Sequence, residues 1–161
     1  MPDGVLEAAL YAHDLIAAEQ FYREVLGLIV IAHQPGRHVF FRCGQTLLLV
    51  FNPQETANAT VSINGNALPK HGAQGASHVA FSVAESALSL WRERLRKEEV
   101  CLEAEIAWPQ GGHSLYVRDP AGNSVELATP SIWPQLTGVS TQRIDAGQPR
   151  RLSSRARMQR H

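Results

Sequence analysis

The sequence predicts a mixed α+β fold built from two copies of one β-α-β-β-β module. The first observation is a strand followed by a capped helix, at residues 5–27 and again at residues 77–99. The second is a pair of β-rich strands around a glycine turn, at residues 38–49 and again at residues 112–129. Repetition of this kind decides the fold, because each copy is one supersecondary unit that needs a neighbour to bury its apolar face.

The helix of each copy has recognisable ends or a clear apolar side. In the first copy, Asp14 is the predicted N-cap and Gly27 the predicted stop of a helix over residues 15–26. Apolar residues recur in this helix at spacings of three and four, which gives one apolar stripe. The second helix is predicted over residues 85–99, with apolar residues on one side and charged residues on the other. Both helices therefore have one side suited to packing.

The strands are assigned from runs of β-forming residues between turn signals. They are predicted at residues 5–11, 28–33, 37–43, 46–51, 76–83, 100–107, 114–118 and 124–127. Alternation places Glu7 on one face with Tyr11, and Tyr116 on one face with Ser114.

Two segments lack a regular pattern. The polar stretch over residues 52–75 is predicted to be an active-site flap or a mobile linker. From about Thr137 the chain is polar and rich in arginine, which predicts a flexible basic tail over residues 137–161. We therefore expect one domain at residues 5–136, with modules at 5–53 and 76–133 and a connection at 54–75.

Composition excludes several classes of protein. The chain has 161 residues, 44% of them apolar, and a formal net charge of zero, so nothing global favours nucleic acid. No apolar run approaches the roughly 18–20 residues that span a bilayer. The two cysteines form no Cys-x-x-Cys motif, and no secretory signal precedes them, so free thiols are expected. We expect a cytoplasmic protein.

The hairpin at residues 112–129 contains an isolated carboxylate. Val125 and Leu127 fall on one face of its second strand, and Glu126 falls on the other. Such a carboxylate is solvated, ion-paired or bound to a cation. Asp119 is predicted to stabilise the turn between the two strands and is not proposed as catalytic.

Two stretches together suggest a family. Residues 6–28, LEAALYAHDLIAAEQFYREVLGL, resemble an opening run of strand, Asp-Leu, helix, Phe-Tyr and Leu-Gly-Leu, and residues 114–127, SLYVRDPAGNSVEL, resemble a closing Tyr-x-x-Asp-Pro-x-Gly-Asn-x-x-Glu. Both runs resemble those of the vicinal oxygen chelate (glyoxalase, bleomycin resistance and extradiol dioxygenase) superfamily. The resemblance covers residues 5–133 and implies two βαβββ modules whose sheets form a cleft.

The resemblance also implies a metal site in that cleft, with ligands from the first and last strand of each module. Carried over by position, the four slots are Glu7, Leu48, His78 and Glu126, and Leu48 departs from the pattern. Glu7, His78 and Glu126 are thus the implied ligands of one divalent metal ion. Two carboxylates and one imidazole suit Mn, Fe, Ni, Co or Zn, and three protein ligands leave positions open for substrate.

Further polar residues are candidates for catalysis and substrate binding. Glu126 and Tyr116 are the candidate catalytic residues, and Tyr116 is either a proton donor to a bound oxyanion or a core tyrosine. The candidate substrate-binding residues are His38, Ser114 and Arg42, with Arg37 as the alternative to Arg42.

The resemblance implies three classes of function. We favour a metal-dependent lyase or isomerase that polarises a small oxygenated substrate. An Fe(II) extradiol-type dioxygenase is the second class, although such members usually place a histidine where Glu7 stands. A metal-free drug- or metabolite-binding protein, like the bleomycin-resistance members, is the third. Members often form homodimers, and some complete the site across the dimer, so a homodimer is expected here.

Overall fold

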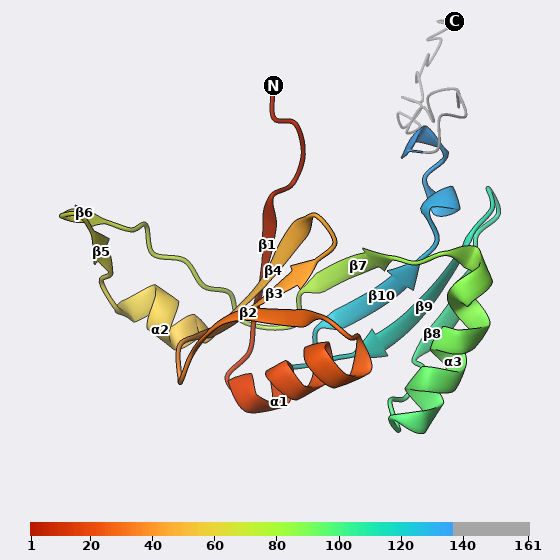
Figure 1. The fold of residues 1–161 in the computed structure, drawn as a ribbon, viewed down its shortest axis with the longest axis horizontal. Helices are drawn as coiled ribbons and strands as arrows, with labels where there is room; N and C mark the ends of the chain where they lie inside the picture. Colours follow the sequence, from red (N-terminus) through yellow and green to blue (C-terminus); the bar gives the residue numbers. More distant parts are fainter. Residues whose placement is uncertain (137–161) are drawn as a thin grey trace, which may run out of the picture.

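The computed structural model describes residues 1–136 and confirms the two-module α+β architecture (Figure 1). The predicted tail at residues 137–161 lies outside the described residues. Each module has one four-stranded sheet, with strand order β1-β4-β3-β2 in the first and β7-β10-β9-β8 in the second. In both sheets the first strand of the module pairs in parallel with the last. The repeat read from the sequence is therefore also a repeat of topology.

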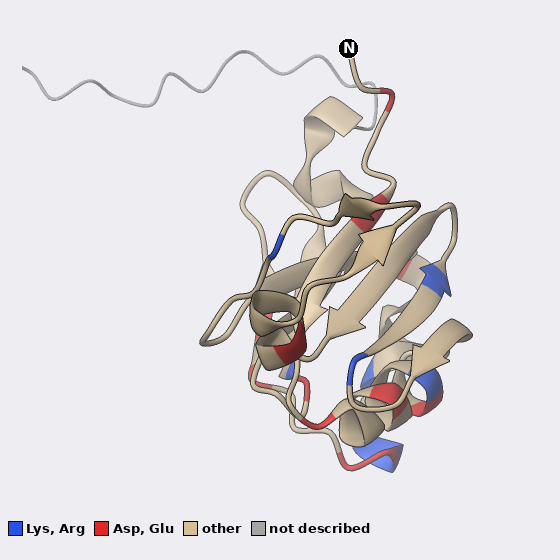
Figure 2. Ribbon diagram, turned by 90° about the vertical axis from the view of Figure 1, so that its left-hand side faces the viewer, with Lys and Arg blue, Asp and Glu red and all other residues tan. Residues whose placement is uncertain are grey.

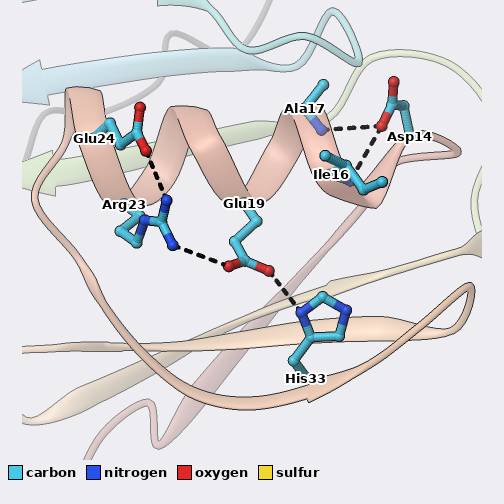
Figure 3. A network of polar contacts seen from close by, with 7 residues as sticks. All are labelled: Asp14, Ile16, Ala17, Glu19, Arg23, Glu24 and His33. Atoms are coloured by element: carbon cyan, nitrogen blue, oxygen red, sulfur yellow. Dashed lines mark hydrogen bonds and ion pairs between the residues drawn. The ribbon is translucent and has the colours of Figure 1, made fainter.

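The first module follows the predicted elements closely. Its elements are β1 (Glu7–Tyr11), α1 (Leu15–Gln20) with the π-helical continuation η1 (Phe21–Val25), β2 (Ile29–Gln34), β3 (His38–Cys43) and β4 (Thr46–Phe51). The Asp14 carboxylate accepts hydrogen bonds from the backbone N–H groups of Ile16 and Ala17, at 3.1 and 2.9 Å (Figure 3). Gly27, at φ +74°, ends the helix as predicted.

The second module contains β7 (His78–Ser82), η2 (Glu85–Ala87), α3 (Leu88–Lys97), β8 (Ala104–Ala107), β9 (His113–Arg118), β10 (Ser124–Ala128), η3 (Pro130–Ile132) and η4 (Pro134–Leu136). The strand predicted from residue 100 begins four residues later. Glu99 has φ +55°, and the N–H of Val100 donates to the carbonyl of Leu95, so these residues still close the helix. None of the described helices is long and apolar enough to cross a bilayer.

The segment between the modules has structure that the sequence pattern did not indicate. It contains α2 (Pro53–Asn58) and a short hairpin of β5 (Ser62–Ile63) and β6 (Asn66–Ala67). Asn52 caps α2, and the proline after it occupies the first turn, where a missing N–H costs nothing. We call residues 52–75 the arm; Figure 1 shows it extending from the first module, away from the second.

One hydrophobic core runs through both modules. Buried side chains of α1, η1, β3 and β4 form a single cluster with those of α3, β9 and β10. One face of each sheet faces this core, and the opposite faces carry Glu7 in the first module and His78, Tyr116 and Glu126 in the second. The candidate residues therefore lie outside the core.

A buried polar cluster joins the two modules. The hydroxyl of Tyr22, in η1, donates to Oδ2 of Asp119 at 2.8 Å. Oδ1 of Asp119 accepts from the N–H groups of Ala121 and Asn123, and the Asn123 amide donates to Oδ2 and to the carbonyl of Tyr11. Burial, and then the Asp119 carboxylate, raise the pKa of Tyr22 far above its ordinary value. Asp119 therefore stabilises its turn, as predicted, and it also makes a contact between the two modules.

The solvent side of the first helix carries a chain of ion pairs (Figure 3). Arg23 contacts Glu24 at 2.6 Å and Glu19 at 3.4 Å, and Glu19 contacts Nδ1 of His33 on β2 at 2.6 Å. Exposed pairs of this kind contribute about 0–1 kcal/mol each. They support the position of the helix less than the core does.

We predict that Tyr22→Phe lowers the free energy of unfolding by about 1.5–3 kcal/mol, because it removes a buried hydrogen bond to a carboxylate. Urea denaturation measures this change. Tyr11→Phe is the matched control: its hydroxyl bonds His71 at the surface, so its loss is expected to cost less than about 1 kcal/mol. Equal stability of Tyr22→Phe and wild type would contradict the inter-module role.

Candidate metal and substrate site

His78 and Glu126 lie side by side on the outer face of the second sheet. Nε2 of His78 is 3.2 Å from Oε2 of Glu126, and Nδ1 is 3.2 Å from the carbonyl oxygen of Ser124. If Nδ1 carries the ring proton and donates it to that carbonyl, Nε2 turns a lone pair toward the carboxylate. Two acceptors at this distance require a proton or a cation between them.

The other oxygen of Glu126 has no partner. Glu126 is only 5% exposed, and its Oε1 is buried without a hydrogen bond among the described residues. A buried, unpaired carboxylate oxygen is costly unless a ligand satisfies it. The pair of side chains therefore has the donor atoms and the unused binding capacity that a divalent metal requires.

Tyr116 borders this pair. It lies opposite Glu126 in the β9–β10 register, and its ring stacks near His78 with centroids 6.3 Å apart. Burial, followed by the Glu126 carboxylate, raises the pKa of Tyr116, so it is a neutral phenol at physiological pH. Ser114, on the same strand, is fully buried, and its hydroxyl oxygen accepts from the indole N–H of Trp108 at 2.8 Å.

The first module has a pocket of about 630 Å³ on the face that carries Glu7. Its floor comes from β3 and β4, and the arm forms its other wall. The lining includes Glu7, Arg37, His38, Phe40, Leu49 and Phe51, together with Thr56, Val61, Leu68, Lys70 and His71 of the arm. The arm is thus a wall of this pocket, and the choice between a flap and a mobile linker stays a prediction.

One predicted cleft position is wrong. Leu48 is 2% exposed and belongs to the core. Leu49 lies two residues beyond the strand partner of Glu7, just as Glu126 lies two residues beyond the strand partner of His78. The one-residue error arises because the first hairpin has a shorter turn than the second, so counting from the glycines misaligns them. Leu49 also cannot bind a metal, and the implied ligand set is unchanged.

A single chain does not gather the three implied ligands. Within residues 1–136, no three His, Cys, Asp or Glu side chains come together closely enough to hold a metal. His78 and Glu126 form one part of the set, and Glu7 lies on the other sheet. The triad therefore stays a prediction.

Of the candidate substrate-binding residues in the first module, some line the pocket and one does not. His38 lines the pocket, and its Nδ1 is buried without a hydrogen-bond partner among residues 1–136. Burial, and then the charge of Arg37, lower the pKa of His38, which favours the neutral ring. Arg42 is exposed and is not part of the pocket lining, whereas Arg37 is. Of the two arginines, only Arg37 is therefore positioned in the pocket lining.

Sequence reasoning missed Phe51 and His71. Their rings meet edge to face at 4.8 Å, and Nδ1 of His71 is hydrogen-bonded to the Tyr11 hydroxyl at 2.9 Å. Alternation along residues 46–51 would have placed Phe51 on the Glu7 face. His71 had no such signal, because it lies in the arm.

The comparison with known families decides the wider identity. The sequence pattern of the Glyoxalase/Bleomycin resistance protein/Dioxygenase superfamily matches residues 4–127. This chain belongs to that superfamily. The resemblance noted from the two sequence motifs is confirmed.

Individual relatives of the superfamily differ in reaction. A crystal structure of lactoylglutathione lyase from Agrobacterium tumefaciens is 44% identical, covers 82% of this chain and 97% of its own, and has a TM-score of 0.76. The "Putative ring-cleaving dioxygenase MhqE" of Bacillus subtilis is 29% identical over 120 residues, which are 68% of this chain. The match spans only 36% of that relative. The fosfomycin resistance protein FosX from Mesorhizobium loti, 18% identical with a TM-score of 0.58 over 84% of this chain and 99% of its own, shares the fold.

We predict that Glu126→Gln lowers the pKa of Tyr116, because the negative charge next to the phenol is lost while its burial remains. Nuclear magnetic resonance of ¹³C-labelled tyrosine, with chelator present, measures this shift. In wild type the folded pKa exceeds the unfolded value of about 10, so the phenol's contribution to stability is complete below that pH and is lost as pH rises through the folded pKa. In Glu126→Gln only the folded pKa falls, so that loss starts at the same pH, ends at a lower pH and is smaller in total.

Glu103→Gln is the control for this titration. Glu103 forms an ion pair with Arg118, at the end of β9, at 2.7 Å. Its replacement is therefore expected to leave the pKa of Tyr116 unchanged. An equal change in both variants would show that the effect is not specific to Glu126.

Proposed function

We propose that the protein is a divalent-metal-dependent lyase or isomerase that polarises a small oxygenated substrate at a Glu7, His78 and Glu126 metal site. The observation that carries this proposal is the buried, unpartnered Oε1 of Glu126 beside Nε2 of His78. The 44% identity to a structure named lactoylglutathione lyase, across 97% of that chain, supports lyase-type chemistry. Mn, Fe, Ni, Co and Zn all remain candidates, because this ligand set does not choose among them.

We further propose a homodimer in which Glu7 of the partner subunit joins His78 and Glu126. Two observations support it: the ligands do not meet within residues 1–136, and β1 and β7, which carry Glu7 and His78, are both edge strands. Each has one side with unpaired backbone groups that a second copy can cover. In a twofold dimer the complementary parts would meet twice and give two equal sites.

Each residue then has a chemical role. When bound, the metal would act as a Lewis acid toward a substrate oxygen. Tyr116, held as a neutral phenol, is placed to donate a hydrogen bond or a proton to an oxyanion on the same face. Glu126 is the carboxylate next to it and is proposed both to bind the metal and to exchange a proton with the substrate. His38, Ser114 and one of Arg37 or Arg42 are proposed to contact the substrate.

We predict near-stoichiometric metal in wild type and loss of most of it in Glu7→Ala, His78→Ala and Glu126→Ala. Inductively coupled plasma mass spectrometry of protein purified without chelator measures metal content. Glu105→Ala is the matched control, because that glutamate is exposed and pairs with Arg92 away from the site. If the wild-type protein binds none of Mn²⁺, Fe²⁺, Ni²⁺, Co²⁺ and Zn²⁺, the metal-dependent function is wrong and the metal-free binding protein is the class that remains. Oxygen uptake with catechols by the iron-loaded protein would instead support a dioxygenase.

The shared site predicts complementation between inactive subunits. When Glu7→Ala and Glu126→Ala proteins are mixed, unfolded and refolded together, about a quarter of all sites should contain every ligand. Metal content and any activity should recover to that fraction, while each variant refolded alone stays empty. If the mixture stays empty although native mass spectrometry detects the heterodimer, the ligands do not come from two subunits.

A further inference from the structure

The outer faces of the two modules have equivalent backbone positions, but these positions carry different kinds of side chain. Phe40 lies opposite Leu49 in the first sheet, where Tyr116 lies opposite Glu126 in the second. Two further pairs on the first face join His38 with Phe51 and Arg42 with Leu47. At these positions the second module therefore presents a carboxylate and a phenol, whereas the first presents mainly aromatic and apolar side chains.

The rings of the first face form a continuous layer, which we call the aromatic shelf and define as His38, Phe40, Phe51 and His71. The rings of His38 and Phe40 stack at 4.1 Å with an interplanar angle of 13°. Phe51 meets Phe40 edge to face at 5.1 Å and His71 at 4.8 Å. A shelf of this kind favours flat rings, which gain both apolar burial and ring–ring attraction.

Two cations line the same pocket as the shelf, and one of them, Arg37, directly precedes His38 at one end of it. The Arg37 side chain makes no hydrogen bond or ion pair with any residue in the described part of the chain. Nζ of Lys70 donates to the carbonyl of Asn58 at 3.0 Å and has no carboxylate partner among those residues. Neutral His38 adds no charge. Figure 2, which views the molecule from the side of the arm, shows that few residues of the strands are charged.

The carboxylate of the pocket lies at the other end. Glu7 pairs with Leu47, whereas Arg37 directly precedes His38, the partner of Phe51. Phe51 lies four positions after Leu47 on β4, which corresponds to about 13 Å along the strand. The proposed metal end and the cationic end are therefore on opposite sides of the shelf.

We propose that the substrate has a flat aromatic body that lies on this shelf, with an anionic group at Arg37 and Lys70 and its reacting oxygens at the Glu7 end. The position of the reacting oxygens rests on the proposed function. The shelf and its cations do not, since a single chain supplies all of them. The pocket volume of about 630 Å³ lies within the range of small-molecule sites.

The test is calorimetric binding of 2-naphthoate to the chelator-treated full-length protein. 2-Naphthol supplies the ring without the carboxylate, and acetate supplies the carboxylate without the ring. We expect 2-naphthoate to bind at least about tenfold more tightly than either, because only it satisfies the shelf and the cations together.

Variants assign the binding to the shelf. Phe40→Ala and Arg37→Gln are each expected to weaken 2-naphthoate binding about tenfold. Arg23→Gln is the control, because this exposed arginine pairs with Glu19 and Glu24 on the first helix, outside the pocket lining. Phe40→Leu keeps apolar bulk without the ring; if Phe40→Ala does not fold, a loss of affinity in Phe40→Leu still tests stacking.

The results separate this inference from the proposed function. Glu126→Ala, which removes a proposed metal ligand that is not part of this pocket, is expected to keep 2-naphthoate binding. A protein that binds metal, but binds 2-naphthoate no more tightly than acetate or with no dependence on Phe40 and Arg37, would overturn the aromatic shelf alone. Shelf-dependent binding by a protein that takes up no metal would overturn the metal site alone.

Discussion

The rest of the structure depends on the buried contact between Tyr22 and Asp119. This contact ties the first helix to the turn that precedes β10, and Asn123 extends it to the backbone of Tyr11 at the end of β1. The strands that carry Glu7 and Glu126 are therefore both connected to one polar cluster. A buried carboxylate needs all of its partners, so this cluster allows little freedom in how the modules are joined.

The two modules show how a repeated backbone can hold different chemistry. Their strand orders and parallel pairings are the same, yet one outer face carries aromatic rings and the other carries an imidazole, a phenol and a carboxylate. The core-facing positions of both sheets stay apolar, because they share one hydrophobic cluster. The outward positions are free of that packing requirement, and a functional site can be built there without altering the fold.

The same division explains why a single chain presents separate parts of the proposed metal site. The shared core sets how the modules are joined, and β1 and β7 remain edge strands in that arrangement. Glu126 is already buried there, and its Oε1 has no hydrogen-bond partner in the part of the chain that the structure describes. Under the proposed function, this environment would preorganise the carboxylate for a further ligand.

The sequence by itself determined the repeat, the limits of most strands, the Asp14 cap and the outward alternation of Glu7, His78, Tyr116 and Glu126. These features are local: they follow from periodicity and from residues that cap helices or form turns. Only the tertiary structure decided that Leu49 rather than Leu48 matches Glu126, that Arg37 lines the pocket, and that His71 reaches it from the arm. Those features depend on turn length, strand register and contacts between distant segments, which a one-dimensional pattern does not encode.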